Sequence, residues 1–134
     1  MTIEWDYEKM TTGLSEIDEQ HKEWIHRFNE FDNALVNRKG QDALQSAISF
    51  FAQYAETHFA SEEACMTQYH CPAQAANRAA HDGFRIKLSE IKDWVDQEGA
   101  TMVEAMALEL VLEEWLVNHI CTIDVQLRDV VASS

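Results

Sequence analysis

One stretch of the sequence decides the fold. Residues 41–69 read QDALQSAISFFAQYAETHFASEEACMTQY and contain neither glycine nor proline. Apolar side chains recur there at steps of three and four residues, as from Leu44 to Phe51, which is the period of an amphipathic α-helix. His58 and Glu62 lie on the same stripe. The stretch therefore predicts a long helix that turns an imidazole and a carboxylate toward the protein core.

Three glycine or proline positions divide the chain into four such segments. Gly40, Pro72 and Gly99 are breakers of this kind, and breakers mark loops between helices. Apolar residues recur with the helical period in the other three segments, and Thr101 and Glu104 form a capping-box pattern at the start of the last one. The four predicted helices span residues 18–37, 41–69, 72–97 and 101–131. Pro72 is expected to be the first residue of the third helix, a position that suits proline.

Residues 1–17 show no sustained period, and we expect them to form an extended N-terminal arm that packs on the helices. A chain of 134 residues is normally one domain, and we find no internal repeat or linker. The predicted fold class is all-α. We expect an up-down-up-down four-helix bundle that forms a single domain over residues 1–134.

The charge balance argues against several classes of function. The chain has 24 acidic and 10 basic residues, a net charge of −14, and such a protein repels phosphate backbones and anionic lipids. The N-terminus has no signal-peptide pattern, and no segment approaches the ~20 apolar residues of a membrane span. We therefore expect a cytoplasmic protein that binds neither nucleic acid nor membranes.

The cysteines do not suggest a crosslinked or zinc-bound scaffold. Cys65, Cys71 and Cys121 are odd in number and have no CxxC spacing, which argues against a disulfide framework and a zinc ribbon. We expect them to be small apolar core residues.

Polar side chains interrupt the apolar stripes of all four predicted helices. Burying a carboxylate or an imidazole without a partner costs several kcal/mol, so each of these groups needs compensation. A single buried histidine is ordinarily explained by a hydrogen bond to a carbonyl group. Histidines on four separate helices, together with two carboxylates, point instead to a shared metal site. The candidate ligands are His21, His58, Glu62, His81, His119 and Asp124.

The spacing of these residues supports a common site. His58 and Glu62 are four residues apart, which places them on one helical face about 6 Å from each other. His119 and Asp124 are five residues apart, about 140° around an ideal helix. They converge only where the helix bends or where a metal pair is approached from two sides. Imidazole and carboxylate ligands suit iron, manganese or zinc, and we expect Glu62 and Asp124 to bridge two metals.

Four stretches of the chain resemble the signatures of the hemerythrin family, in order and with matching spacings over nearly the whole length. They are residues 13–22 (GLSEIDEQHK), residues 58–63 (HFASEE) followed by Met66, Pro72 followed by residues 81–84 (HDGF), and residues 115–120 (WLVNHI) through Asp124.

This resemblance implies a left-handed bundle that holds two non-haem iron ions, bridged by Glu62, Asp124 and an oxo or hydroxo group. It assigns His21 and His58 to the iron at which family members bind O₂, and His81 and His119 to the other iron. Three residues fall where the family lines its apolar O₂ pocket, although ordinary core packing explains them equally well. They are Trp115, Leu116 and Ile120.

One position departs from the family pattern. The third helix of the family normally carries two histidines four residues apart, and the first of them is Asn77 here. An asparagine offers a weak carbonyl ligand, or leaves the position to water or an external ligand. We therefore expect a more open iron that is readily autoxidised. His26 and His70 are expected at the surface and are not candidate ligands.

The expected function is to bind O₂, or to sense O₂ or the redox state, with nitric oxide and peroxide as further small ligands. A sensor needs a signalling output domain or protein that these residues do not supply. A first alternative is a di-iron oxidase, peroxidase or nitric-oxide-reactive enzyme, but the sequence offers no separate general base or substrate cleft. A second alternative is a metal-poor structural or partner-binding bundle, which the six retained ligand positions argue against.

Overall fold

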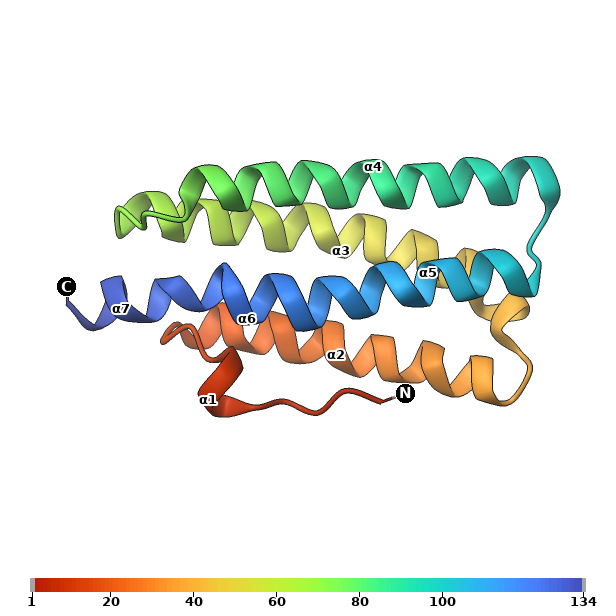
Figure 1. Cartoon of the computed structure of the whole chain (residues 1–134), viewed down its shortest axis with the longest axis horizontal. Coiled ribbons are helices and arrows are strands. Elements are labelled where there is room, and N and C mark those ends of the chain that lie inside the picture. Colours follow the sequence, from red (N-terminus) through yellow and green to blue (C-terminus); the bar gives the residue numbers. More distant parts are fainter. Residues whose placement is uncertain (1, 134) are drawn as a thin grey trace.

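The computed structural model of the chain describes residues 2–133. Four long helices lie side by side, and the loops between them alternate between the two ends of the molecule (Figure 1). The first three are α2 (Ser15–Val36), α3 (Gly40–Gln68) and α4 (Gln74–Glu98). The fourth is made of α5 (Met102–Glu114), η1 (Trp115–His119), α6 (Ile120–Thr122), η2 (Asp124–Gln126) and α7 (Leu127–Ala132). The predicted all-α four-helix bundle is confirmed.

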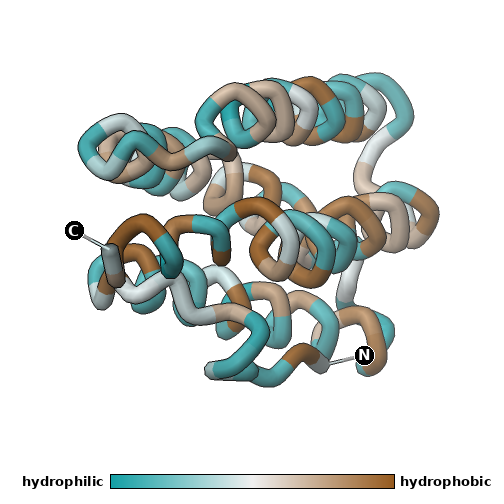
Figure 2. The backbone as a smooth tube through the Cα atoms, turned by 60° about the vertical axis from the view of Figure 1, so that its left-hand side comes forward, coloured by the Kyte–Doolittle hydropathy of each residue, from teal (hydrophilic) through white to brown (hydrophobic). Residues whose placement is uncertain are grey.

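Apolar residues from all four long helices form the main core. Hydrophobic and hydrophilic stretches alternate along the helices (Figure 2), as amphipathic helices require. Trp24 of α2 is fully buried, and its ring contacts Phe51 and Phe59 of α3 and Trp115 of η1 at centroid distances of 5.6, 6.1 and 6.2 Å. Phe84 of α4 adds a fourth contact to Trp24 at 5.4 Å, so the aromatic cluster joins all four long helices.

A second, smaller core lies toward the loop between α3 and α4. Its buried members are Met66, Cys71, Ala73 and Leu127. Along α3, Phe59 of the main core precedes Glu62, and Met66 of the smaller core follows it. The polar residues on the helix stripes therefore lie between two apolar layers.

The sequence predicts an extended arm over residues 1–17, but the arm is not extended throughout. Tyr7–Met10 form the short helix α1, and the Asp6 side chain caps it by accepting a hydrogen bond from the Lys9 N–H group at 3.2 Å. Before α1 the chain runs along α2 (Figure 1), where the Asn29 side chain pairs with the Ile3 backbone at 2.8 Å. Residue 1 lies outside the described residues.

Helix α2 begins at Ser15, three residues before the predicted start at residue 18. Asp18 lies inside the first turn and does not mark the helix start. Its carboxylate accepts hydrogen bonds from the Thr11 and Thr12 hydroxyl groups and from the Thr12 N–H group, each at 2.8 Å. Asp18 therefore ties the arm to α2.

Helix α4 begins at Gln74. The prediction that Pro72 is its first residue is therefore wrong. His70 has a φ of 53° and the Cys71 N–H group donates to the Met66 carbonyl at 2.9 Å, an arrangement that closes the end of α3. The Gln74 N–H group then donates to the Cys71 carbonyl at 3.2 Å. Pro72 is thus the second residue of a turn, a position that suits its fixed φ equally well.

Gly40 is the first residue of α3, whereas the sequence analysis placed it in the preceding loop. The chain reverses earlier, at Arg38, which has a φ of 61°. A Cβ atom at residue 40 would clash with the Leu35 side chain and would lie 3.4 Å from Ala105. A side chain here would require the flexible end of the Leu35 side chain to shift, so glycine favours the close approach of α2 and α3.

Two further sequence expectations concern the cysteines, which are predicted to form no disulfide framework, and membrane-spanning segments. All three thiols are free; Cys71 is buried, and Cys65 and Cys121 are partly buried against the two cores. No helix within residues 2–133 combines the length and the apolar character needed to cross a membrane.

Candidate metal centre

Seven polar side chains meet between the two apolar layers, and all of them are buried. They are His21 of α2, His58 and Glu62 of α3, Asn77 and His81 of α4, His119 of η1 and Asp124 of η2. The two pairs on α3 and α4 are each four residues apart, so each pair lies on one face of its helix. The structure therefore brings together all six candidate ligands and Asn77.

The first group of possible ligand atoms comes from His21, His58, Glu62 and Asp124, and these atoms lie within 4.8 Å of one another. The Nε2 atom of His21 is 3.0 Å from His58 Nε2, 3.2 Å from Glu62 Oε2 and 3.2 Å from Asp124 Oδ2. Two imidazole nitrogens thus face two carboxylate oxygens, a donor set that suits one transition-metal ion.

The second group comes from Glu62, His81, His119 and Asp124 and is equally compact. His81 Nε2 lies 3.0 Å from Glu62 Oε1. His119 Nε2 lies 2.8 Å from Asp124 Oδ1 and 4.0 Å from Glu62 Oε1. This group again offers two imidazole nitrogens and two carboxylate oxygens.

The two groups share both carboxylates, with a different oxygen atom in each. Glu62 turns Oε2 toward His21 and Oε1 toward His81. Asp124 turns Oδ2 toward His21 and Oδ1 toward His119. An arrangement of this kind can hold two cations with two bridging carboxylates.

Asn77 lies at the edge of the second group. Its Oδ1 atom is 3.0 Å from His119 Nε2, and its Nδ2 atom is fully buried and has no hydrogen-bond partner within residues 2–133. The amide oxygen can serve as a weak additional ligand. The amide N–H₂ can therefore donate a hydrogen bond to a ligand that binds beside the second group of ligand atoms.

The backbone of the last long helix is irregular around His119 and Asp124. Trp115–His119 form a π-helix, and after the short α6 the chain tightens into a 3₁₀-helix that begins at Asp124. Ile123, which lies between the two residues, has a φ of −103°, so the angle between His119 and Asp124 departs from its value of about 140° in a regular α-helix, while the π-helix sets how both residues are rotated relative to α5. This is a bend of the kind that the spacing required.

Two polar residues outside the groups orient the histidines. The Nδ1 atom of His58 is 2.7 Å from Gln20 Oε1, and the Nδ1 atom of His81 is 2.7 Å from Glu63 Oε2. Each imidazole that donates from Nδ1 leaves its Nε2 atom free to bind a metal. The sequence patterns alone predict no role for Gln20 or Glu63. The available signal was that each adjoins a candidate ligand along the chain.

The acidic and basic groups of the centre change one another's pKa values. Burial alone lowers the pKa of His21, but the Asp124 and Glu62 carboxylates outweigh burial and raise it to about 9. The same balance raises the pKa of His119 to about 9. Burial raises the pKa of Glu62, but the four surrounding histidines bring it well below its ordinary value. In the metal-free protein, protonated histidines therefore compensate the buried carboxylates.

The unmet hydrogen-bonding capacity of the centre fits a cation. Both oxygens of Asp124 are buried without a well-formed hydrogen bond to any described residue, although histidine nitrogens lie within 3.2 Å of them. A buried carboxylate that lacks well-formed hydrogen bonds is costly unless a positive charge compensates it. The donor set, two imidazoles and two carboxylates on each side, is one that non-haem iron, manganese or zinc accepts.

The remaining sequence candidates are core or surface residues. Trp115, Leu116 and Ile120 are buried in the main core, and the Trp115 ring stacks on His119 with a centroid distance of 3.9 Å. His26 is exposed and lies 2.8 Å from Glu30. His70 is exposed at the end of α3.

Comparison with known proteins agrees with this centre. A family model described as the hemerythrin HHE cation binding domain matches residues 12–128. The chain belongs to the hemerythrin family. Its similarity to bacteriohemerythrin of Pseudomonas aeruginosa (strain LESB58) is 29% identity over 125 residues, covering 93% of this chain and 79% of that protein.

A second hemerythrin relative comes from a eukaryote. The hemerythrin-like protein of Naegleria gruberi is 26% identical over 126 residues, covering 94% of this chain and 91% of that protein. No solved structure matches the chain. Membership of the hemerythrin family thus rests on the family model, and the cation-binding description of that model agrees with the two groups of ligand atoms.

Proposed function

We propose that this hemerythrin-family protein binds two non-haem iron ions and uses them to bind O₂ or to sense O₂ or the redox state. The observation that carries the proposal is the division of the Glu62 and Asp124 oxygens between two pairs of histidines. The names of the relatives, bacteriohemerythrin and hemerythrin-like protein, support the same assignment. The cytoplasmic location expected from the sequence stays a prediction.

Each ion has its own pair of imidazoles in this proposal. His21 and His58 hold the first ion, and His81 and His119 hold the second. Glu62 and Asp124 would be shared by both ions, and the family resemblance implies an oxo or hydroxo group as a further ligand. When bound, an iron pair supplies a change between ferrous and ferric states and a position for a small ligand such as O₂.

The protein residues around the ions have separate tasks. Gln20 and Glu63 fix the orientation of the His58 and His81 rings. Trp115 and the neighbouring aromatic side chains exclude bulk water from the centre. Asn77 offers an amide oxygen where the family normally has an imidazole, so the second ion is held less firmly. We therefore expect the ferrous protein to autoxidise readily and to serve better as a sensor than as a reversible carrier.

An enzymatic function is the second candidate, and a cavity favours it. A cavity of about 300 Å³ opens between α4 and the last long helix and is lined in part by His119. Such a cavity can admit peroxide or nitric oxide as a substrate. Turnover separates the two functions, because a sensor is oxidised once per site whereas an enzyme cycles.

Anaerobic reconstitution with ferrous iron tests the proposal. We expect two irons per chain by metal analysis, and an absorption spectrum that changes on exposure to air. A reversible coloured adduct indicates O₂ binding, and rapid irreversible change to a diferric spectrum indicates a redox sensor or an oxidising enzyme. Far fewer than two irons per chain would contradict the proposal.

A further inference from the structure

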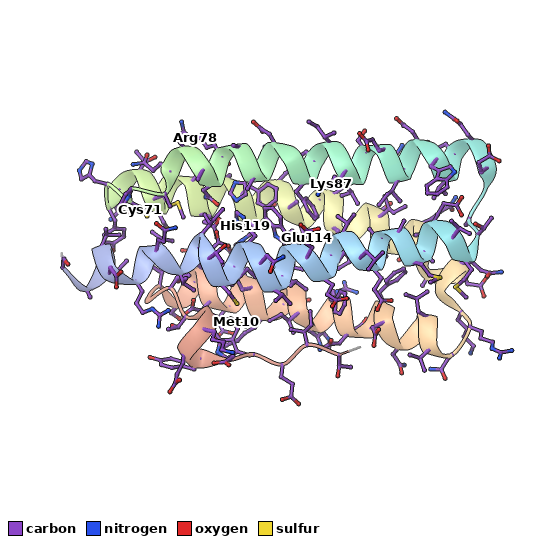
Figure 3. All side chains as sticks on the ribbon, viewed as in Figure 1. Met10, Cys71, Arg78, Lys87, Glu114 and His119 are labelled. Carbon is purple, nitrogen blue, oxygen red and sulfur yellow. The ribbon has the colours of Figure 1, made fainter. Side chains whose placement is uncertain are left out.

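The cavity between α4 and the last long helix reaches the candidate centre on one side. Its lining includes the exposed Lys87 and Glu114 on opposite walls and the buried His119. The side chains of these three residues lie along the space between α4 and the helix that faces it (Figure 3). His119 is 6% exposed, whereas the other five candidate ligands are at most 1% exposed. Of the six candidate ligands, His119 alone is among the lining residues, so the cavity approaches the second group of ligand atoms and not the first. Asn77 does not line the cavity; its Oδ1 atom lies 3.0 Å from His119 Nε2, on the buried side of that residue.

Gly83 keeps this cavity open. It lies in the middle of α4 with an ordinary helical backbone, where glycine destabilises a helix relative to alanine. A Cβ atom added at Gly83 would meet no atom within 4 Å. Close packing therefore does not require glycine here, in contrast to Gly40. The missing side chain leaves empty space in the cavity wall, next to that of Ala80 one turn earlier.

A buried hydrogen-bond donor, Asn77 Nδ2, lies on the His119 side of the centre. The Nδ2 atom of Asn77 is fully buried without a partner, and the Oδ1 atom of the same amide is 3.0 Å from His119 Nε2. A buried donor without an acceptor is unfavourable. A small acceptor that arrives beside His119 would satisfy it.

We propose that the cavity is the entrance by which a small external ligand reaches the Asn77–His119 side of the centre, where Asn77 Nδ2 donates a hydrogen bond to it. The ligand class is a small neutral molecule or monoanion with an oxygen or nitrogen acceptor. Lys87 and Glu114 are the charged residues of the walls and offset each other, so neither kind of ligand is repelled. This inference rests on the proposed function, because it needs a metal in the second group, and it adds a ligand position distinct from the His21–His58 side.

Azide binding to the iron-loaded, oxidised protein tests the entrance. Stopped-flow absorption gives the association rate for the natural sequence and for Gly83→Leu, which fills the cavity. We expect Gly83→Leu to bind azide at least about tenfold more slowly at unchanged iron content, because the ligand then enters only after a side-chain rearrangement. An unchanged rate in a fully loaded Gly83→Leu protein overturns the proposal and shows that azide enters elsewhere.

Two control variants isolate the cavity from general effects on α4. Gly83→Ala adds only a Cβ atom and should leave the rate within about twofold. Ser89 also lies on α4 but lines a separate cavity of about 200 Å³, whose lining includes no candidate ligand. Ser89→Leu should therefore leave the azide association rate unchanged. A tenfold loss in Ser89→Leu would contradict the assignment of the entrance to this cavity.

Metal-free protein provides a readout that does not depend on iron. Gly83→Ala and Gly83→Leu should both raise the midpoint of thermal unfolding, because each improves helix propensity and Leu also fills empty space. A lowered midpoint for Gly83→Leu would show that the cavity cannot hold the side chain. In that case Ala80→Leu fills the same cavity from the preceding turn, and its azide rate decides the proposal.

The donor role of Asn77 has its own test. Asn77→Ala removes the N–H₂ group, and we expect azide to dissociate faster and to bind about tenfold more weakly. Equal affinity would refute the hydrogen bond. If the unaltered protein does not load two irons, the proposed function fails first, and this inference falls with it. Full loading with no effect of Gly83→Leu removes this inference alone.

Discussion

At Glu62, Oε2 faces His21 and His58 while Oε1 faces His81. Asp124 divides its oxygen atoms between His21 and His119 in the same way. Loss of either carboxylate therefore removes one oxygen from each of the two groups. Substitution of a single histidine affects one group alone.

Replacing Glu62 with alanine tests the shared role of this carboxylate. We expect Glu62→Ala to bind far fewer than two irons per chain, measured by metal analysis after anaerobic reconstitution. Glu63→Ala is the matched control, since it removes only the acceptor for the His81 Nδ1–H group and should weaken metal binding by about 10–100-fold without abolishing it. Full dinuclear loading in Glu62→Ala would refute the bridging role.

Asn77 stands where the resemblance to the hemerythrin family predicts a histidine. We expect Asn77→His to supply an imidazole in place of a weak amide ligand and so to slow oxidation of the ferrous protein in air. The absorbance of the diferric product, followed over time after mixing with air, measures the rate. An unchanged rate at equal iron content would show that Asn77 does not control the openness of the second iron position.

At the scale of the element, the last long helix differs from the other three. Helices α3 and α4 each present two polar residues at an interval of four, which a regular α-helix places on one face, and α2 presents His21 alone. The last helix presents His119 and Asp124 at an interval of five: a π-helix over Trp115–His119 precedes them, and the backbone departs from regular α-helix at Ile123, before the 3₁₀-helix from Asp124. The irregular backbone occurs where two functional side chains converge, as is frequent for π-helical turns.

Deletion of one residue tests the π-helix. Val117 is 41% exposed, so removing it sacrifices little packing while taking out the extra residue of the wide turn. We expect a protein whose far-ultraviolet circular dichroism remains helical but which binds markedly less iron, because the deletion rotates His119 and Asp124 together about the helix axis relative to α5 and so turns both away from the centre. Val117→Ala keeps the chain length and should load iron normally. Normal loading in the deletion variant would show that the π-helix is not needed.

At the scale of the whole molecule, the centre joins all four long helices through carboxylate and imidazole side chains. The carboxylates attract the imidazoles strongly only when the imidazoles are protonated. In the metal-free protein, the raised pKa values of His21 and His119 supply the positive charge. Metal ions that bind the folded state in the proposed way would displace these protons, and metal binding would then be linked to folding.

The stability of the metal-free protein should therefore depend on pH. The pKa values of His21 and His119 rise from 6.5 to about 9 on folding. Their stabilising contribution is complete below pH 6.5 and is lost as the pH rises through 9, by at most about 3 kcal/mol for each histidine. Urea unfolding at pH 6 and pH 9.5 measures the difference in free energy.

Two comparisons make this pH prediction specific. His119→Gln should show a smaller fall between the same two pH values, because one of the two protonated imidazoles is absent. Iron-loaded protein should not follow the metal-free profile, since the metal replaces the protons. Equal unfolding free energies at pH 6 and pH 9.5 in the metal-free protein would contradict the assigned charge balance.

Much of the fold could be predicted because it follows from local patterns. The period of apolar residues indicates helices wherever it persists, as from Leu44 to Phe51. Helix starts and ends were less predictable. Asp18 and Pro72 resemble helix-start residues, but Asp18 binds the arm through Thr11 and Thr12, and Pro72 fits a turn as well as a first helical turn. Their hydrogen bonds, and not their residue type, decide which structure forms.

The sequence by itself determined the four-helix architecture and the identity of the residues that can meet in the centre, because helical period and residue chemistry are both local properties of the chain. Only the tertiary structure decided which carboxylate oxygen faces which histidine, that Gln20 and Glu63 orient two rings, and that Gly83 borders an open cavity. Those features depend on the rotation and distance of one helix relative to another. Such quantities arise from packing side chains of separate segments together, and no spacing within a single segment contains them.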